Sequence, residues 1–218
     1  MAIGIAREGA HVILLARTVG GLEEVDDEIR AFGGTATLVN LDLRQGEKVD
    51  ALGPTIYQRW GKLDILVANA GVLGPLSPLS HITADAWNEV IEVNLTANWR
   101  LIRSLDPVLR RAEAARAVFV SSGAAAAKSA YWGPYAVSKA GLEALVKTYA
   151  HEVASTPIKV NLLNPGPVRT TMRSRAFPGE NPATLPAPEA LVPLFLDLVD
   201  ARLTESGRVY DFRTGTSK

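Results

Sequence analysis

Residues 117–145 read AVFVSSGAAAAKSAYWGPYAVSKAGLEAL, and this stretch decides the fold of the chain. Its apolar start, Ala117–Val120, ends at two serines and a glycine, which predicts a short buried strand that stops at a loop. The second half predicts a helix, because Pro134 suits a first helical turn and apolar residues recur beyond it at helical spacing. A strand that leads through a loop into a helix is typical of open α/β sheets, whose ligands bind at the carboxyl ends of the strands.

The predicted helix begins with Tyr135 and Lys139, which are four residues apart and therefore share one helix face. The ammonium group and the helix N-terminus both favour a phenolate, so we expect the pKa of Tyr135 to lie below its usual value of about 10. Such a tyrosine is a general acid or base, with Ser122 at the strand end as a partner. The same residues also occur in ordinary helices and turns, but the strand–loop–helix setting favours catalysis.

Short apolar runs alternate with helical patterns along the rest of the chain. The runs are nearly continuous in apolar residues, as in a parallel sheet that is covered on both faces. The alternation predicts a Rossmann-type doubly wound α/β sheet in three layers, formed by one domain of residues 1–218. The predicted strands are His11–Ala16, Thr35–Leu41, Asp64–Ala68, Ala117–Ser121, Ile158–Leu163 and Gly207–Phe212, and the predicted helices are Leu22–Phe32, Glu47–Trp60, Ala84–Arg111 (whole or broken), Pro134–Ser155 and Pro188–Ala201.

The composition argues against several classes of function. The 218 residues carry 23 basic and 23 acidic side chains, so no broad field would attract nucleic acid or an anionic membrane. The absence of cysteine excludes disulfides and thiolate chemistry, and the three histidines show no ligand spacing. We therefore expect a cytoplasmic protein with no metal, no nucleic-acid partner and no membrane partner.

The chain resembles the short-chain dehydrogenase/reductase family over essentially its whole length. Several sequence elements carry the resemblance, and they occur in the order that the family has them. They are Asn69-Ala70-Gly71 after a predicted strand, Asn94 within Glu-Val-Asn-Leu, the set of Ser122, Tyr135 and Lys139, and Asn164-Pro165-Gly166-Pro167-Val168-Arg169-Thr170.

This resemblance implies an NAD(P)-dependent oxidoreductase that interconverts a small-molecule carbonyl and its alcohol by hydride transfer. By the same resemblance, Tyr135 exchanges a proton with the substrate oxygen, and Ser122 hydrogen-bonds that oxygen. Lys139 lowers the pKa of the tyrosine and holds the nicotinamide ribose. Asn94 anchors a water molecule in a proton path to the lysine, or else merely holds a kink in its helix.

The resemblance also implies where the dinucleotide lies. Thr170 would bond the nicotinamide carboxamide, and Asp42, with Leu43, would border the adenine. The other cofactor-binding residues implied by the family motifs are Asn69, Ala70, Gly71, Pro165, Gly166 and Val168, beside Tyr135 and Lys139. Two of these assignments have structural alternatives, since Asn69 could hold a turn and Thr170 could cap a helix.

The choice of cofactor rests on Arg17, just after the first predicted strand. An acidic residue there would bond the ribose 2′-hydroxyl and select NAD, whereas an arginine accommodates a 2′-phosphate. Ala16 leaves the acidic place empty and Arg17 supplies a cation, so we expect NADP(H) rather than NAD(H). A surface arginine without a role is the alternative.

The chain departs from the family at its start. Met1–Ala10 indicates the last turns of a helix with Gly9 at its C-terminus, and no strand or Thr-Gly-x-x-x-Gly-x-Gly turn precedes it. In the strand order 3-2-1-4-5-6 that first strand is central, so its absence predicts two inner sheet edges without a partner. Three explanations stay open: a start further upstream, a chain that folds with a gap and has lost nucleotide binding, and a non-catalytic partner of complete homologues. The alternative function is therefore nucleotide sensing or protein interaction on the same fold.

Two further regions bear on the substrate and on assembly. Tyr131 and Trp132 either line the substrate pocket or pack the loop before Tyr135. Thr171–Pro186 lies where the family has a variable substrate lid, and its prolines predict a mobile loop. The family commonly forms dimers or tetramers through its two long helices, so we expect a homodimer or homotetramer. Apolar residues on those helices that would serve an interface or the core are Trp99, Leu101, Ile102 and Leu145.

Overall fold

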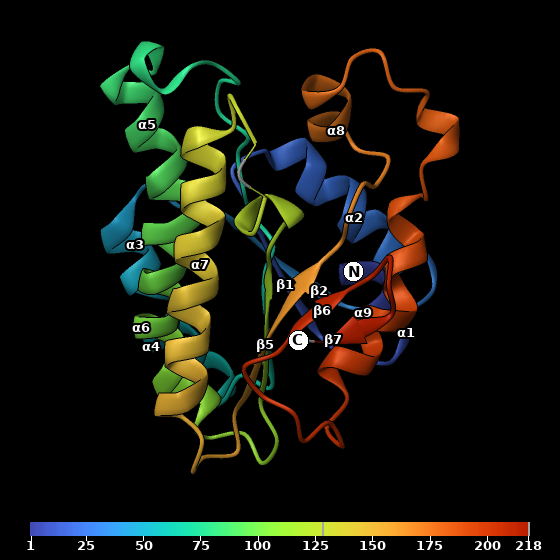
Figure 1. The fold of residues 1–218 in the computed structure, drawn as a ribbon. Coiled ribbons are helices and arrows are strands. Elements are labelled where there is room, and N and C mark those ends of the chain that lie inside the picture. Colours follow the sequence, from blue (N-terminus) through green and yellow to red (C-terminus); the bar gives the residue numbers. More distant parts are fainter. Residues whose placement is uncertain (128, 218) are drawn as a thin grey trace.

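The computed structural model describes residues 1–127 and 129–217, and it has helices on both faces of parallel β-structure (Figure 1). This arrangement confirms the predicted Rossmann-type α/β fold. The strands are β1 (Val12–Ala16), β2 (Ala36–Asn40), β3 (Ile65–Ala68), β4 (Arg116–Val120), β5 (Lys159–Asn164), β6 (Val209–Asp211) and β7 (Thr216–Ser217). The helices are α1 (Ala2–Arg7), α2 (Val19–Ala31), α3 (Gly46–Asp50), α4 (Leu52–Trp60), α5 (Ala84–Ile91), α6 (Ala97–Leu109), α7 (Gly133–Glu152), α8 (Thr171–Ala176) and α9 (Val192–Val199).

The two helical layers explain why the central strands are mostly apolar. In Figure 1, α3 to α7 cover one face of the β-structure, and α1, α2 and α9 cover the other. Strands β4 and β5 lie between these layers, and Val118, Phe119 and Leu162 are fully buried. Because helices cover both faces of these strands, the strands lack the alternation of apolar and polar residues that is typical of a strand with one face in water.

The strands form two sheets rather than one. β1 pairs with β2 in a two-stranded parallel sheet, and β3, β4, β5, β6 and β7 form a five-stranded sheet in that order. The five-stranded sheet is parallel except for β7, an antiparallel end strand that the sequence did not predict. In the part of the chain that the structure describes, no strand ladder joins β1 to β3. The interruption falls where a central strand was predicted to be missing, and the absence of such a strand from this chain stays a prediction.

Side chains hold the two sheets together in place of hydrogen bonds. Val12 of β1 and Ile65 of β3 both pack against one buried cluster, which contains Phe195 of α9 and Ile5 of α1. Apolar burial therefore bridges the place where backbone pairing stops.

Helix α1 ends as predicted, since Gly9 follows it with a φ of 90°.

Three predicted elements differ from those observed. The helix predicted at Glu47–Trp60 is divided into α3 and α4, and the one predicted at Pro188–Ala201 begins with a 3-10 turn, Pro188–Leu191. The segment Thr171–Pro186, predicted to be a loop, contains helix α8. Its cap explains the difference, because the Thr170 hydroxyl accepts a hydrogen bond from the Arg173 N–H at 3.2 Å. None of the described helices is long and apolar enough to cross a membrane.

Candidate active site

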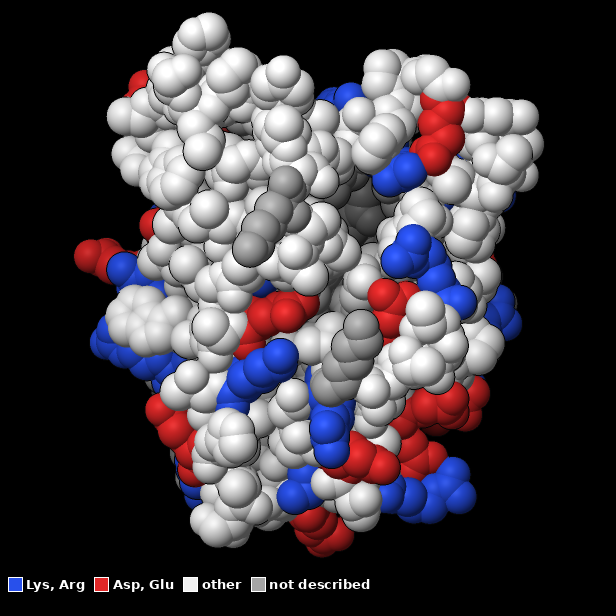
Figure 2. Space-filling model, in the orientation of Figure 1, with Lys and Arg blue, Asp and Glu red and all other residues white. Residues whose placement is uncertain are grey.

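A cavity of about 540 Å³ opens at the carboxyl ends of β3, β4 and β5. Figure 2 shows the surface hollowed between the parts of the molecule that carry α7 and α8. Most of the predicted site residues line this one cavity, although they come from separate segments of the chain. They are Asn69, Ala70, Gly71, Ser122, Tyr135, Lys139, Pro165, Gly166, Val168 and Thr170.

The two serines after β4 take different partners. The Ser121 hydroxyl donates to Glu143 Oε1 at 2.6 Å, and its side chain is buried. The Ser122 side chain is near enough to Tyr135 to affect the pKa of the phenol, and its hydroxyl accepts from the Ala124 N–H at 3.2 Å. Successive residues of an extended chain point to opposite sides, so only one of the two can meet the tyrosine. The structure brings Ser122, and not Ser121, together with Tyr135.

Lys139 lies one helical turn beyond Tyr135, and both side chains are buried. Its ammonium Nζ is 5.9 Å from the centroid of the Tyr135 ring. The same Nζ donates to the backbone carbonyl of Val120, at the end of β4, at 2.7 Å. Burial lowers the pKa of Lys139 to about 8, because a charged amine loses its hydration in the cavity wall. The lysine is therefore held by the strand end with only one of its three donors used.

The expected lowering of the Tyr135 pKa is wrong for this structure. Burial raises the pKa of the phenol above its usual value, and the nearby Ser122 side chain offsets this only in part. The prediction weighed the charge of Lys139 and the helix N-terminus, but the phenol is almost completely buried. Desolvation disfavours the phenolate, so Tyr135 is a protonated phenol at neutral pH.

Asn94 occupies a π-helical turn, Glu92–Thr96, between α5 and α6. Its amide bridges two segments, since Oδ1 accepts from the Val72 N–H at 2.8 Å and Nδ2 donates to the Val72 carbonyl at 2.9 Å. Nδ2 also donates to the Ser138 hydroxyl at 3.0 Å, and the Asn94 carbonyl accepts from Asn98 Nδ2 at 2.8 Å. The side chain is fully buried and does not line the cavity. These bonds fit the structural alternative, in which Asn94 holds a break in its helix.

The residues predicted for the adenine end lie outside this cavity. Arg17 is exposed just after β1, and Leu43 packs against the main core cluster. The Asp42 carboxylate is engaged by Arg44, whose Nη2 lies 2.6 Å from Oδ2 and whose backbone N–H lies 2.9 Å from Oδ1. These bonds and the charge of Arg17 lower the pKa of Asp42 to about 2. Asp42 is therefore an anion with one strong partner already in place.

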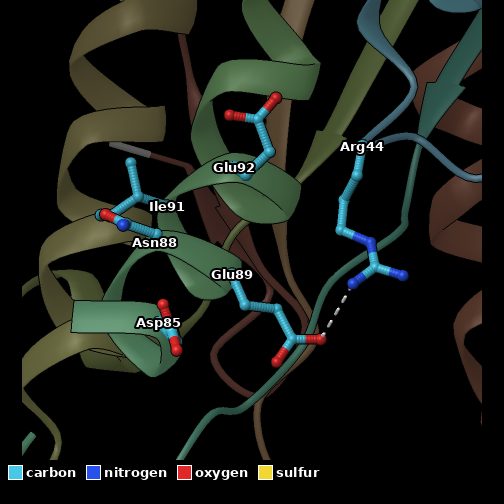
Figure 3. Close-up of a pocket in the computed structure, with 6 residues that line it drawn as sticks. All are labelled: Arg44, Asp85, Asn88, Glu89, Ile91 and Glu92. Carbon is cyan, nitrogen blue, oxygen red and sulfur yellow. Dashed lines mark ion pairs between the residues drawn. The ribbon is translucent and has the colours of Figure 1, made fainter. Parts of the chain in front are cut away.

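Arg44 is a residue that the sequence reasoning missed, although a cation two residues after Asp42 was a visible signal. It lines a second, more open hollow of about 400 Å³ on the α5 side. Figure 3 shows its guanidinium directed at Glu89, at 3.8 Å, with Asp85 and Glu92 on the neighbouring helical turns. This hollow contains none of the residues predicted for catalysis.

Gly71 keeps the floor of the main cavity open for a bound group. A Cβ atom at this position would lie 3.4 Å from Asn94 Oδ1 and 3.6 Å from Lys139 Nζ. Any side chain here would therefore extend toward the amine that the family uses to hold the nicotinamide ribose. The residues present fit a nicotinamide group beside Lys139 and Thr170. Over residues 1–127 and 129–217, no three histidine or carboxylate side chains are grouped so as to hold a metal ion.

A serine, a tyrosine and a lysine thus lie in one cavity at the strand ends of a Rossmann-type sheet, which is where such sheets bind ligands. Residues 1–181 match the family described as short chain dehydrogenase, and this chain belongs to that family. The resemblance predicted from its motifs is thereby confirmed.

Individual relatives agree with the family match. The chain is 34% identical over 218 residues to the uncharacterized oxidoreductase YciK of Escherichia coli K12, covering 98% of this chain and 86% of YciK. It is 35% identical over 185 residues to an uncharacterized NAD-dependent oxidoreductase of Mycobacterium tuberculosis, covering 78% and 67%. A solved structure from Escherichia coli CFT073, described as a short chain dehydrogenase complexed with NADPH, superposes with a TM-score of 0.90 at 35% identity, covering 96% and 89%.

Proposed function

We propose that this chain is an NADP(H)-dependent oxidoreductase that interconverts a carbonyl and an alcohol, with Tyr135 as the acid and base. One observation carries the proposal: Ser122, Tyr135 and Lys139 line the same cavity, with Lys139 Nζ 5.9 Å from the centroid of the Tyr135 ring. Tyr135 and Lys139 are buried and Ser122 is half-buried, so a substrate oxygen bound beside them would be shielded from much of the water during a proton transfer.

When bound, the dinucleotide would be the source of the hydride that the carbonyl carbon takes up in the reducing direction. The Tyr135 phenol, protonated at neutral pH because burial raises its pKa, gives its proton to the carbonyl oxygen. Ser122 donates a hydrogen bond to that oxygen and holds it beside the phenol. Lys139 Nζ faces the phenolate that remains, and its charge stabilises it. In the oxidising direction the phenolate takes the alcohol proton back.

The cofactor residues are proposed on the same basis. Lys139 would hold the nicotinamide ribose, Thr170 the carboxamide, and the backbone of residues 69–71 and 165–168 would line the path of the dinucleotide. Asp42 and Leu43 would border the adenine, and Arg17 would meet a 2′-phosphate. The NADPH complex of the Escherichia coli CFT073 relative supports NADP(H), while the Mycobacterium tuberculosis relative is named for NAD. We place NADP(H) first because Arg17 provides a cation and no acidic residue stands at that strand end.

The non-catalytic alternative is not favoured, since Ser122, Tyr135 and Lys139 line one cavity and the relatives bear the names of oxidoreductases.

We propose a cytoplasmic homodimer or homotetramer. Of the residues named for its interface, Leu101 and Ile102 belong to the core, whereas Trp99 is 43% exposed. Light scattering on the purified chain measures the assembly directly.

The test of the proposed function is Tyr135→Phe, which removes only the proton that is transferred. We expect kcat for NADPH-dependent carbonyl reduction to fall about 10²–10⁴-fold, while the Kd for NADPH changes less than about twofold. The matched control is Tyr131→Phe, the same change four residues earlier on a ring that is 59% exposed. Unchanged turnover in Tyr135→Phe would remove the tyrosine from the mechanism.

A further inference from the structure

The cavity wall next to Tyr135 is built from aromatic and apolar side chains. The Trp132 ring meets the Tyr135 ring edge-on, with centroids 5.9 Å apart, and lies 5.7 Å from the Phe177 ring. Trp132 comes from the residue before α7 and Phe177 from the residue after α8, so the wall joins two segments that are distant in sequence. Further apolar side chains of the lining are Leu73, Met172, Ala176 and Leu191.

Each cation that lines this cavity already interacts with another group of the protein. Among the described lining residues, they are Lys139, Arg173 and the Met1 amino group. Lys139 donates to the Val120 carbonyl, and the proposed function assigns its other donors to the nicotinamide ribose. Burial lowers the pKa of the Met1 amino group, which interacts with Glu189.

Arg173 is the cation nearest the aromatic wall, and it is neutralised there. Its Nε and Nη2 each lie 2.6 Å from one oxygen of Glu180, which makes a two-point ion pair. The flat face of its guanidinium covers the Phe177 ring at 3.7 Å. A paired and stacked guanidinium of this kind has little charge left for a substrate. The stem of the arginine, which lines the cavity, is thereby part of the wall.

We propose that the substrates of this site are neutral, and that an aromatic or similarly flat apolar group on the reacting carbon packs against Trp132, Phe177 and Met172. This inference rests on the proposed function, since it places the reacting oxygen at Ser122 and Tyr135. A ring on the wall gains burial and edge or face contacts with the aromatic pair. A carboxylate at the same place would lose its hydration and find Arg173 already bound to Glu180.

The first arm of the test is a panel of aldehydes, reduced with NADPH by the intact chain. Benzaldehyde is compared with 4-carboxybenzaldehyde, which adds a charge, and with propanal, which lacks the ring. We expect kcat/KM for benzaldehyde to exceed each of the others at least tenfold. Equal values, or a preference for the carboxylate, would overturn the proposed substrate class while leaving the oxidoreductase function in place.

Variants locate the preference in the wall. Trp132→Leu and Phe177→Leu should each lower kcat/KM for benzaldehyde at least fivefold and change that for propanal less than twofold. Trp99→Leu, on the outer face of α6, is the matched control and should change neither. Glu180→Gln frees the Arg173 guanidinium and should raise the ratio of 4-carboxybenzaldehyde to benzaldehyde at least threefold. If the wall variants reduce both substrates equally, the ring does not pack there.

A binding arm separates this inference from the proposed function. Benzyl alcohol should quench the tryptophan fluorescence of the wild-type chain more strongly than that of Trp132→Leu, and benzoate should have little effect in either. Quenching without turnover of any aldehyde would refute the oxidoreductase function and keep the apolar site. Turnover without this quenching would refute the apolar site alone, and the absence of both would refute both proposals.

Discussion

The five-stranded sheet and the two-stranded sheet of this molecule share one fold but differ in how completely they are paired. β4 has a partner on both sides, and the strand ends of β3, β4 and β5 carry the candidate catalytic cavity. β1 pairs with β2 alone, and this sheet carries Arg17 and precedes Asp42, the candidates for cofactor selection. The residues proposed for chemistry thus rest on the part with continuous hydrogen bonding, and those proposed for selectivity on the part without it.

This difference has a physical consequence for each kind of residue. Catalytic groups must be held within fractions of an ångström, and Lys139 is bound to the carbonyl that ends β4. A group that attracts a phosphate acts through charge, which reaches further and needs less exact placement. The smaller sheet can therefore tolerate an open edge at less cost to its proposed role.

The largest effect is expected on stability, when a buried leucine is shortened in each of the two sheets. Leu162→Ala, in β5 at a fully buried position, should lower the free energy of unfolding by about 4 kcal/mol. Leu14→Ala, in β1, should lower it by only about 2 kcal/mol. Leu14 is 7% exposed and belongs to a small cluster of buried residues, so its side chain is less completely enclosed. Urea unfolding of both variants measures this, and equal losses would show that the two sheets are equally well packed.

The next effect is a pH dependence of the free energy of unfolding, which comes from Lys139 in the cavity beside the five-stranded sheet. The pKa of Lys139 is about 8 in the folded chain and about 10.4 in an unfolded one. Between these values the unfolded state binds a proton that the folded state lacks, so the free energy of unfolding rises with pH, by roughly 3 kcal/mol at most. Lys139→Met should remove this rise in urea titrations from pH 7.5 to 10. Lys147→Met, on an exposed position of α7, should keep it, and a rise that survives Lys139→Met would assign it to another group.

The smallest effect concerns the two-stranded sheet. Arg17→Ala should weaken NADPH binding about tenfold and leave NADH binding unchanged, since only NADPH has the 2′-phosphate. Arg59→Ala, another exposed arginine, should affect neither cofactor. Isothermal titration with both cofactors decides the matter. If Arg17→Ala weakens NADH binding as strongly, Arg17 acts on the fold of β1 and does not select the cofactor.

Local sequence patterns were sufficient for much of the fold. The strand predicted at Ala117–Ser121 and the helix predicted at Pro134–Ser155 agree with β4 and α7 to within three residues at each end. Gly9 marked a helix end, and the six predicted strands all occur. These features depend on side-chain periodicity and on the conformations of glycine and proline, which short segments carry on their own.

What needed the tertiary structure involved residues far apart in the chain. Arg44 became relevant because it reaches toward Glu89, and the aromatic wall forms because Phe177, after α8, packs against Trp132, before α7. The direction of the Tyr135 pKa also depended on burial, which a charge count along the helix does not contain. The sequence by itself determined six of the strands, most of the helices and which residue types stand at the strand ends. Only the tertiary structure decided which of those residues lose water and which already have partners, because desolvation and pairing arise between segments that the fold brings together.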